Sequence, residues 1–372
     1  MIGGPPYPEV VPAVKLHKLE SLNVYDSPDF SPANFSRIFT PLNFCEFMAW
    51  HLGMFAEPFT FSIRAYRKLQ KEGLRFKFDI VHDNQGLGYG LLLTKRLKVP
   101  VIATVHHPIP IDRELSLAQA KNLWEKFGLM RWYSFCAMQR LVAERMDRVI
   151  TVSQSSAEET RRIFKVPQSK IRVVYNGVDS DFFKRDDNVL KEPNSLIVIN
   201  SGQIQIKGTG YLLKGLQLLR KEMKVKLTIV ATDTPDSQYA RLVKEYGLDD
   251  IVTFTGKIDR QELVRRYSAA EVAVVPSLYE GFGLPAAEAM SCKLPVIAAK
   301  AGALPEVVGE DGDAGIFVPP ADANALAAAI KRLLSDELLR RKMGEAGRER
   351  MKRNFTWEQA AKKTLAVYEE LL

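Results

Sequence analysis

Apolar runs rich in β-branched residues alternate with helical patterns from one end of the 372-residue sequence to the other. This alternation is typical of parallel β-sheets covered by helices on both faces. In the first half it predicts strands at Val14–Leu19, Asp79–His82, Val101–His106, Arg148–Val152 and Ile171–Tyr175. In the second half it predicts strands at Leu196–Asn200, Lys226–Val230, Val252–Phe254, Val272–Val275, Pro295–Ala298 and Gly315–Val318. The sequence therefore predicts an α/β protein.

A charged, turn-rich stretch separates the two halves. The segment Y-N-G-V-D-S-D-F-F, which starts at Tyr175, is followed by K-R-D-D-N-V-L-K-E-P-N-S and then by the next apolar strand. Domains usually hold about 100–200 residues, so a chain of this length suggests two of them. We expect one Rossmann-like domain over residues 1–184 and a second over residues 185–355, followed by a last helical segment over residues 356–372.

Cysteine usage and hydropathy bear on the cellular compartment. Three cysteines stand far apart in the sequence without C-x-x-C spacing, which argues against a disulfide framework and against structural zinc. The N-terminus lacks a basic segment followed by an apolar run, and the most apolar stretch, Phe44 to Ile63, is interrupted by charged residues and Pro58. The sequence predicts a soluble protein of the reducing cytoplasm.

The basic excess lies mainly in the N-terminal half. Residues 1–184 hold 25 Lys and Arg against 18 Asp and Glu, whereas residues 185–372 hold 27 against 26. A solvated surface, general attraction to polyanions and peripheral contact with an anionic membrane all remain open. No basic-aromatic RNA motif or helix-turn-helix pattern occurs, so nucleic acid is not expected. The pattern from Leu129 to Met146 predicts one amphipathic core helix, with a membrane-contacting helix as the alternative.

The loop after the predicted strand Val272–Val275 has the features of a phosphate site. Its glycines, Gly281 and Gly283, allow close backbone approach, and Pro285 suits the first turn of a helix. Ligands of open parallel sheets bind at the carboxyl ends of strands, against helix N-termini. We therefore expect the backbone amides of Phe282, Gly283 and Leu284 to face an anion.

Two glutamates flank this cradle. Glu288 falls about one turn into the helix, where its carboxylate can accept hydrogen bonds from vicinal hydroxyls such as those of a ribose. Glu280 precedes the glycines, on the other side of the phosphate. A ligand with hydroxyl groups at both ends and a diphosphate between them is a nucleotide sugar. The alternative is that Glu280 caps the helix and Glu288 is a surface residue favoured by the helix dipole.

Residues 276–320, which begin P-S-L-Y-E-G-F-G-L-P-A-A-E-A-M, resemble the donor-site region of the retaining family-4 glycosyltransferases, with its E-x7-E motif. The resemblance continues in T-V-H-H at Thr104, V-I-T-V-S-Q-S-S at Val149, L-K-G-L at Leu213 and F-T-W at Phe355, and covers nearly the whole chain. It implies a GT-B fold, in which two Rossmann-like domains face each other across a cleft. The C-terminal domain would hold the donor, the N-terminal domain the acceptor, and the last helix would cross back onto the N-terminal domain.

The resemblance also implies roles for particular residues. Glu288 would bind the ribose, and Glu280 with the three amides would bind the donor sugar and phosphates. Lys207 would steady the diphosphate, and His106 would contact the reacting sugar from the N-terminal domain. Further donor contacts would come from Gly202, Gln203, Lys257 and Ile258. No metal or cofactor is implied beyond the nucleoside diphosphate sugar itself, because D-S-D at Asp179–Asp181 belongs to the domain-end motif.

Two departures from the family pattern qualify these expectations. Gln203 stands where the family usually has an arginine, so either Lys207 and the helix dipole suffice, or Lys214 helps, or activity is weak. The chain also opens at G-P-P-Y-P-E, where family members first have a strand-helix-strand unit. A truncation, a natural deletion or a unit supplied by another chain would explain this. If Val14–Leu19 does not pair with Asp79–His82, the open sheet edge predicts a homodimer.

The leading hypothesis is a retaining glycosyltransferase that moves a sugar from a UDP- or GDP-sugar to an unidentified acceptor, such as a lipid or a glycan. The alternative is a nucleotide-sugar-binding pseudo-enzyme without transfer activity, because the acceptor loop is missing. The two differ in whether the donor turns over when an acceptor is present.

Overall fold

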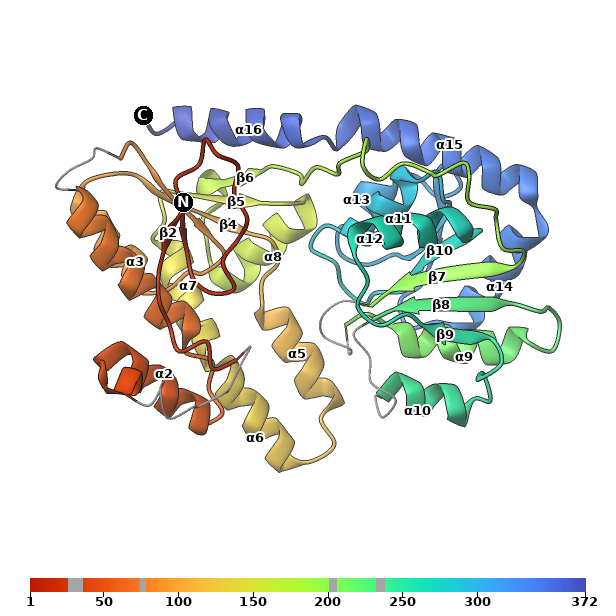
Figure 1. The fold of residues 1–372 in the computed structure, drawn as a ribbon, viewed down its shortest axis with the longest axis horizontal. Coiled ribbons are helices and arrows are strands. Elements are labelled where there is room, and N and C mark those ends of the chain that lie inside the picture. The colour runs from red at the N-terminus through yellow and green to blue at the C-terminus, as the bar shows by residue number, and fades with distance from the viewer. Residues whose placement is uncertain (26–35, 74–77, 201–205, 232–237) are drawn as a thin grey trace. The chain divides into compact units, whose positions relative to one another are not determined.

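The structure is a computed structural model that describes residues 1–25, 36–73, 78–200, 206–231 and 238–372 (Figure 1). The chain forms two compact α/β units. Unit 1 comprises Met1–Thr151, Ala157–Val173 and Ala366–Leu372, and unit 2 comprises Val152–Ser156 and Val174–Leu365. The short segment Val152–Ser156 therefore belongs to unit 2, although the chain on either side of it belongs to unit 1.

Unit 1 is built on a parallel sheet with the strand order β3-β4-β5-β6. These strands are Val81–Asn84, Val101–Val105, Arg148–Thr151 and Ile171–Val173. All five residues of β4 are buried, as a central strand covered on both faces requires. The helices of unit 1 are α2 (Pro41–His51), α3 (Glu57–Gly73), α4 (Gly90–Thr94), α5 (Pro110–Gln119), α6 (Leu123–Trp132), α7 (Cys136–Glu144) and most of α8 (Gln154–Phe164).

The N-terminal segment differs from the prediction. In place of a strand over Val14–Leu19, only β2 (His17–Lys18) forms, and it pairs in parallel with β1 (Ile2–Gly3) in a separate sheet. Among the described residues, β3 has only β4 as a strand partner. A pair of two-residue strands has too few residues to show a sequence period, which explains why the sequence did not reveal it.

The single helix predicted from Leu129 to Met146 is also wrong. A 3₁₀ turn at Tyr133–Phe135 separates α6 from α7. α7 buries Met138, Val142 and Ala143 against the core of unit 1, whereas α6 has no buried residue. The core-helix interpretation therefore holds for α7 alone.

Unit 2 contains a six-stranded parallel sheet with the order β12-β11-β10-β7-β8-β9. Its strands are β7 (Ser195–Ile199), β8 (Lys226–Val230), β9 (Val252–Phe254), β10 (Val272–Val275), β11 (Val296–Ala299) and β12 (Gly315–Val318). These bounds confirm the strands predicted for the second half within about one residue. The strand order runs outward in opposite directions from β7 and β10, so the switch point of the sheet lies between these two strands.

Helices cover both faces of this sheet. They are α9 (Thr209–Leu219), α10 (Gln238–Glu245), α11 (Arg260–Ala269), α12 (Leu284–Ser291), α13 (Leu304–Val308), α14 (Ala323–Ser335) and α15 (Glu337–Asn354). The last helix, α16 (Trp357–Glu369), is divided between the units, because its residues from Ala366 onward belong to unit 1. Leu196 and Val198 of β7 contribute to the apolar core on one face, and Ile197 contributes to the core on the other. The carboxyl ends of β7 and β10, which pair in parallel, consequently lie side by side at one edge of a well-buried sheet.

In the described part of the chain, no helix is both long and apolar enough to cross a membrane.

Candidate functional site

The loop from Pro276 to Gly283, called the donor loop below, leads from β10 into α12 at the switch point of unit 2. Gly283 is the residue before the helix and has a φ of 96°, a conformation that favours glycine. A Cβ there would lie 2.8 Å from a methyl carbon of Leu304. Pro285 occupies the first turn of α12, where its missing N–H costs nothing. The strand-loop-helix arrangement expected from the sequence is present.

The donor loop brings Glu280 and Lys207 together. The Lys207 ammonium lies 2.8 Å from Oε1 of Glu280, and the Ser277 hydroxyl donates to the same oxygen at 2.8 Å. Both charged side chains are largely buried, with 16% and 11% of their surfaces exposed. In this arrangement the carboxylate neutralises the lysine, and an incoming diphosphate would compete with it for that cation.

A second glycine fixes the position of Lys207. Gly208, with a φ of 66°, precedes α9, and a Cβ on it would lie only 2.0 Å from the Pro276 carbonyl oxygen. The Leu278 amide also donates to the Ile206 carbonyl at 2.7 Å. The backbone that carries Lys207 is therefore in direct contact with the donor loop.

Glu288 projects from α12 into a half-buried position. The hydroxyl of the buried Tyr267 donates to its Oε2 at 3.2 Å. Burial raises the pKa of Glu288 to about 7, although the Tyr267 hydrogen bond and the charge of Arg260 oppose the shift. Burial likewise raises the pKa of Tyr267 well above its ordinary value, so Tyr267 remains a hydrogen-bond donor. Glu288 is not the exposed surface residue of the alternative interpretation.

The structure also excludes Glu280 as a helix cap. Gly283 holds the cap position of α12, and no side chain caps it. The carboxylate of Glu280 is instead engaged by Lys207 and Ser277.

The remaining donor residues predicted in this half lie in two loops. Lys257 and Ile258 follow β9 and precede Asp259, whose side chain caps α11 by accepting from the Glu262 amide at 2.8 Å. Lys257 is exposed and Ile258 is half-buried. Gly202 and Gln203 fall outside the described residues.

His106 belongs to unit 1, at the carboxyl end of β4. Its Nε2 lies 2.7 Å from Oδ1 of Asn84, and its backbone amide donates to the Gln85 side chain at 2.6 Å. The side-chain amide of Gln85 in turn donates from Nε2 to the backbone carbonyl of His107 at 2.8 Å. Burial, and then the neighbouring His107, lower the pKa of His106. His106 is therefore a neutral imidazole near pH 7, suited to hydrogen bonding with a hydroxyl.

Sequence reasoning missed several residues of these sites. Ser277 and Tyr267 orient the two glutamates, and Asn84 and Gln85 orient the His106 loop. Asn84 and Gln85 could have been found, because Asn84 ends β3, Gln85 follows it, and the carboxyl ends of parallel strands share one edge. Tyr267 could not, since nothing in its own helix indicates a partner 21 residues away.

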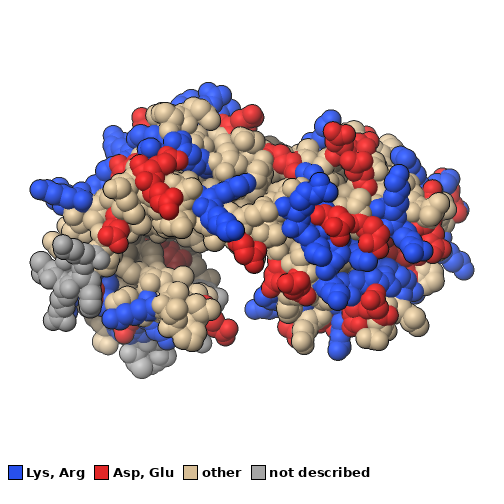
Figure 2. Space-filling view, turned by 90° about the horizontal axis from the view of Figure 1, so that it is seen from above, with Lys and Arg blue, Asp and Glu red and all other residues tan. Residues whose placement is uncertain are grey.

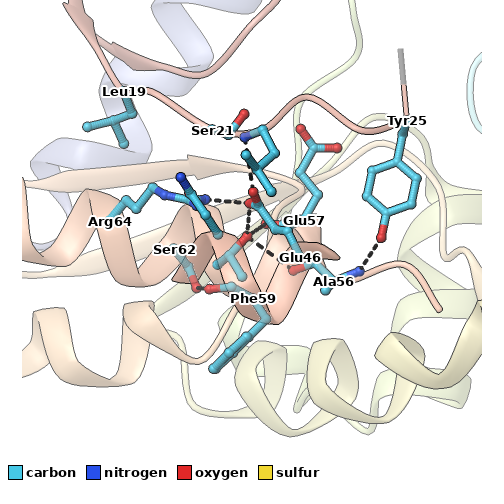
Figure 3. A network of polar contacts seen from close by, with 12 residues as sticks. Leu19, Ser21, Tyr25, Glu46, Ala56, Glu57, Phe59, Ser62 and Arg64 are labelled. Carbon is cyan, nitrogen blue, oxygen red and sulfur yellow. Dashed lines mark hydrogen bonds and ion pairs between the residues drawn. The ribbon is translucent and has the colours of Figure 1, made fainter. Parts of the chain in front are cut away.

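A buried polar network elsewhere in unit 1 has a structural role (Figure 3). Glu46 of α2 is only 2% exposed and accepts hydrogen bonds from Thr60 and Arg64 of α3. Its second oxygen accepts from the Leu22 amide at 3.2 Å. The network fastens the segment before α2 to both helices.

Within the described residues, no group of three or more His, Cys, Asp and Glu side chains is placed to hold a metal ion.

Two family models match the chain. Residues 43–182 match the model described as Glycosyltransferase Family 4, and residues 181–350 match that of Glycosyl transferases group 1. The chain is 41% identical to an MMP alpha-(1->4)-mannosyltransferase of Mycolicibacterium hassiacum, with 100% of this chain and 90% of the relative covered. It is 28% identical to a D-inositol 3-phosphate glycosyltransferase of Kribbella flavida, over 78% of this chain and 71% of the relative.

Solved structures show the same architecture. A sucrose-phosphate synthase from Thermosynechococcus elongatus matches with a TM-score of 0.70 and 28% identity, over 84% of this chain and 78% of that one. HepE of Anabaena, solved with UDP and glucose, matches with a TM-score of 0.69 over 84% and 82% of the chains, and at 19% identity supports the fold alone. The α/β architecture is the GT-B type expected from the sequence.

Proposed function

The chain belongs to glycosyltransferase family 4, and we propose that it is a retaining hexosyltransferase that uses a nucleoside diphosphate sugar. The observation that carries this proposal is the Lys207–Glu280 pair beside the start of α12, with Glu288 about one turn into that helix. The 41% identical mannosyltransferase supports mannose as the transferred sugar. UDP and GDP are both candidates for the nucleotide.

The proposed donor contacts divide the nucleotide sugar into three parts. Glu288 accepts hydrogen bonds from the ribose hydroxyls, and Lys257 and Ile258 lie against the base. Lys207 and the amides of Phe282, Gly283 and Leu284 bind the phosphates, assisted by Gly202 and Gln203. When the diphosphate draws Lys207 away, Glu280 is released to bind hydroxyls of the sugar.

The proposed reaction breaks the bond between the sugar C1 and the phosphate oxygen and forms a bond from C1 to the acceptor oxygen. Negative charge develops on the leaving phosphate, where Lys207 and the N-terminus of α12 stabilise it. The acceptor attacks from the same face, and the leaving phosphate oxygen takes the acceptor proton. His106, neutral near pH 7, hydrogen-bonds the reacting sugar from unit 1. The charge of Lys207 offsets the missing arginine at Gln203.

The test is an assay of donor turnover. UDP- and GDP-sugars, including mannose, are incubated with mannoside, other glycan and phosphoinositol acceptors, and released nucleotide and product are measured. We expect nucleotide release that depends on one acceptor, with an α-linked product from an α-linked donor. A β-linked product would contradict the retaining mechanism. Nucleotide binding without turnover would favour the pseudo-enzyme alternative.

A peripheral membrane contact on unit 1 is a further part of the proposal. Leu123, Trp124 and Met130 of α6 are 81%, 84% and 60% exposed, and Lys126 and Arg131 are exposed on the same helix. Exposed apolar and cationic side chains together are typical of helices that lie in an anionic membrane interface. On the face shown in Figure 2, by contrast, basic and acidic side chains are interspersed, as on a solvated surface. A cytoplasmic location fits three unpaired cysteines.

Vesicle co-sedimentation tests this contact. We expect binding to vesicles that contain phosphatidylserine, loss of binding in high salt, and weaker binding of the Trp124→Ala variant. Trp357→Ala is the matched control, because Trp357 is also exposed, at 53%, but lies on α16. Equal behaviour of both variants, or no binding to anionic vesicles, would contradict the contact.

Self-association through β3 is a separate proposal. Within the described residues β3 ends its sheet, and unpaired strand edges readily pair with another chain. Light scattering at micromolar concentration should give the mass of a dimer, and a monomer would count against it.

A further inference from the structure

The segment Val152–Ser156 is hydrogen-bonded to the donor loop. The hydroxyls of Ser153 and Ser156 both donate to the Gly281 carbonyl, at 2.7 and 3.2 Å, and both serines are fully buried. The Ser153 oxygen also accepts from the Ser156 amide at 3.0 Å. One carbonyl of the donor loop is thus held by the two serines that stand at the start of α8.

Glu306 of α13 holds the same segment from the other side. Its Oε2 accepts from the Gln154 amide at 2.8 Å, and its Oε1 accepts from the Ser155 amide at 2.8 Å. These amides belong to the start of α8, where backbone N–H groups lack helical partners. The Tyr175 hydroxyl donates to Oε2 at 2.9 Å as well. A single carboxylate therefore receives three hydrogen bonds from two separate parts of the chain.

The backbone before Glu306 returns to the donor loop. The Ala303 amide donates to the Glu280 carbonyl at 2.9 Å. Gly302 has a φ of 55°, and a Cβ on it would lie 2.3 Å from that same carbonyl oxygen. The contacts close a ring that runs from Glu280 through residues 302–306 to residues 153–156 and back to Gly281. The ring encloses the peptide that joins Glu280 to Gly281.

We propose that Glu306 is a positioning residue that fixes Glu280 and the amides of the donor loop for transfer. This inference rests on the proposed function of the donor loop. Glu306 acts at a distance, through Ser153 and Ser156 on one side and Ala303 on the other. Glu288 and Lys257 are not members of the ring, so the nucleoside part of the donor is held independently of it.

The Glu306→Gln substitution removes one of the two carboxylate oxygens that accept from residues 154 and 155, and it keeps the shape of the side chain. Glutamine keeps one of the two oxygens and replaces the other with an NH2 group, which cannot accept from the Gln154 or Ser155 N–H that faces it. The ring opens, and Glu280 shifts relative to the sugar. A displacement of about 1 Å at a reacting group can lower the rate about 100-fold. We expect kcat to fall about 10- to 100-fold, with the Kd of the free nucleotide changed less than about 2-fold.

The experiment compares Glu306→Gln with Glu310→Gln. Glu310 lies four residues further along and is exposed, so its variant controls for the lost charge. For each protein we would measure kcat, the donor KM, the Kd of UDP and GDP by calorimetry, and amide hydrogen exchange. The expected result is faster exchange in both residues 152–156 and 276–284 of Glu306→Gln, together with the lower kcat. Glu310→Gln should match the wild type.

Two results would overturn the proposal. One is a wild-type kcat in Glu306→Gln, and the other is a reduced kcat with unchanged exchange in residues 276–284. If Glu306→Gln does not fold, Ser153→Ala tests the same ring, because it removes one donor to Gly281 and leaves the carboxylate intact. If the wild type turns over no donor, the proposed function fails, and the exchange data alone decide whether Glu306 fixes the donor loop.

Discussion

The donor loop of unit 2 and the His106 loop of unit 1 occupy equivalent places at the carboxyl ends of their strands, but they are built differently. In unit 2 the side chain at the loop is a carboxylate, Glu280, paired with Lys207 at 2.8 Å. In unit 1 it is an imidazole with a lowered pKa, bonded to the neutral Asn84. The charged pair suits a diphosphate that exchanges ion partners, whereas the neutral set suits hydroxyl groups. Under the proposed function, this difference would suit the two units to different parts of the substrates.

The largest effect expected from this comparison follows loss of the cation in unit 2. Lys207→Ala should lower kcat about 100- to 1,000-fold, because a charge aimed at the leaving phosphate stabilises the transition state more than the ground state. Steady-state kinetics with the preferred donor measures this. Lys214→Ala is the control, since Lys214 is exposed on α9. A loss in Lys214→Ala without one in Lys207→Ala would assign the phosphate to Lys214 instead.

The backbone contact beneath Lys207 comes next. Gly208→Ala adds a Cβ that would lie 2.0 Å from the Pro276 carbonyl oxygen, so the donor loop must move. Gly247→Ala has a similar φ of 63° but meets only the end of Arg220, at 3.4 Å. Both variants should lose about 1–2 kcal/mol of unfolding free energy from the left-handed conformation. Only Gly208→Ala should also lose nucleotide affinity. Equal nucleotide affinities of the two variants, measured where both are folded, would contradict the proposed effect of Gly208 on the donor loop.

A smaller effect is expected from the neutral site in unit 1. His106→Ala should lower kcat about 5- to 10-fold, since one hydrogen bond between neutral groups contributes about 1 kcal/mol. Because the pKa of His106 is lowered, titration of His106 should cause no change in the wild-type kcat near pH 6.5. The pH profiles of kcat for the wild type and His106→Ala should therefore have the same shape in this range. A loss of more than about 100-fold, or a difference in shape between these profiles, would show that His106 works as a charged or proton-transferring group.

The smallest effect is a pH dependence specific to unit 2. The pKa of Glu288 is raised from an ordinary 4.5 to about 7 by burial, so the carboxylate that accepts from ribose hydroxyls forms only as pH approaches and passes 7. Nucleotide affinity measured by calorimetry should rise a few-fold between about pH 6 and pH 8.

Stability should change in the opposite direction over a lower range. Between pH 4.5 and about 7 the unfolded chain has lost the Glu288 proton while the folded chain retains it, so this group's contribution to the unfolding free energy falls as pH rises. The Glu288→Gln variant removes both dependences. A pH profile that is the same in wild type and variant would assign them to another group.

The sequence predicted unit 2 well and unit 1 less well, for physical reasons. Strands such as Val272–Val275 are continuous apolar runs, and the glycines beside Glu280 mark a turn into a helix, so strand, loop and site could be located together. The turn at Tyr133–Phe135 contains no glycine or proline, and the pattern across it therefore read as one helix. The pairing of β1 with β2 has no periodic signal.

The contacts that orient the site could not be predicted from the sequence, for a different reason. The hydrogen bonds of Glu306 join residues 151 and 152 positions apart, and that of Ser153 to Gly281 spans 128 positions. No local pattern records such partners. The donor roles of Glu280, Lys207 and Glu288 were proposed from their motif, whereas the geometry that holds them required the structure.

Calorimetric titration of UDP, GDP and ADP into the wild type and the Glu288→Ala variant tests the central claim, that unit 2 holds the nucleotide of a donor sugar. We predict saturable binding of UDP or GDP at one site, with binding abolished in Glu288→Ala while the variant keeps the circular dichroism spectrum of the wild type. Binding of the same nucleotide with equal affinity in Glu288→Ala, or binding of none of the three to the wild type, would contradict the account.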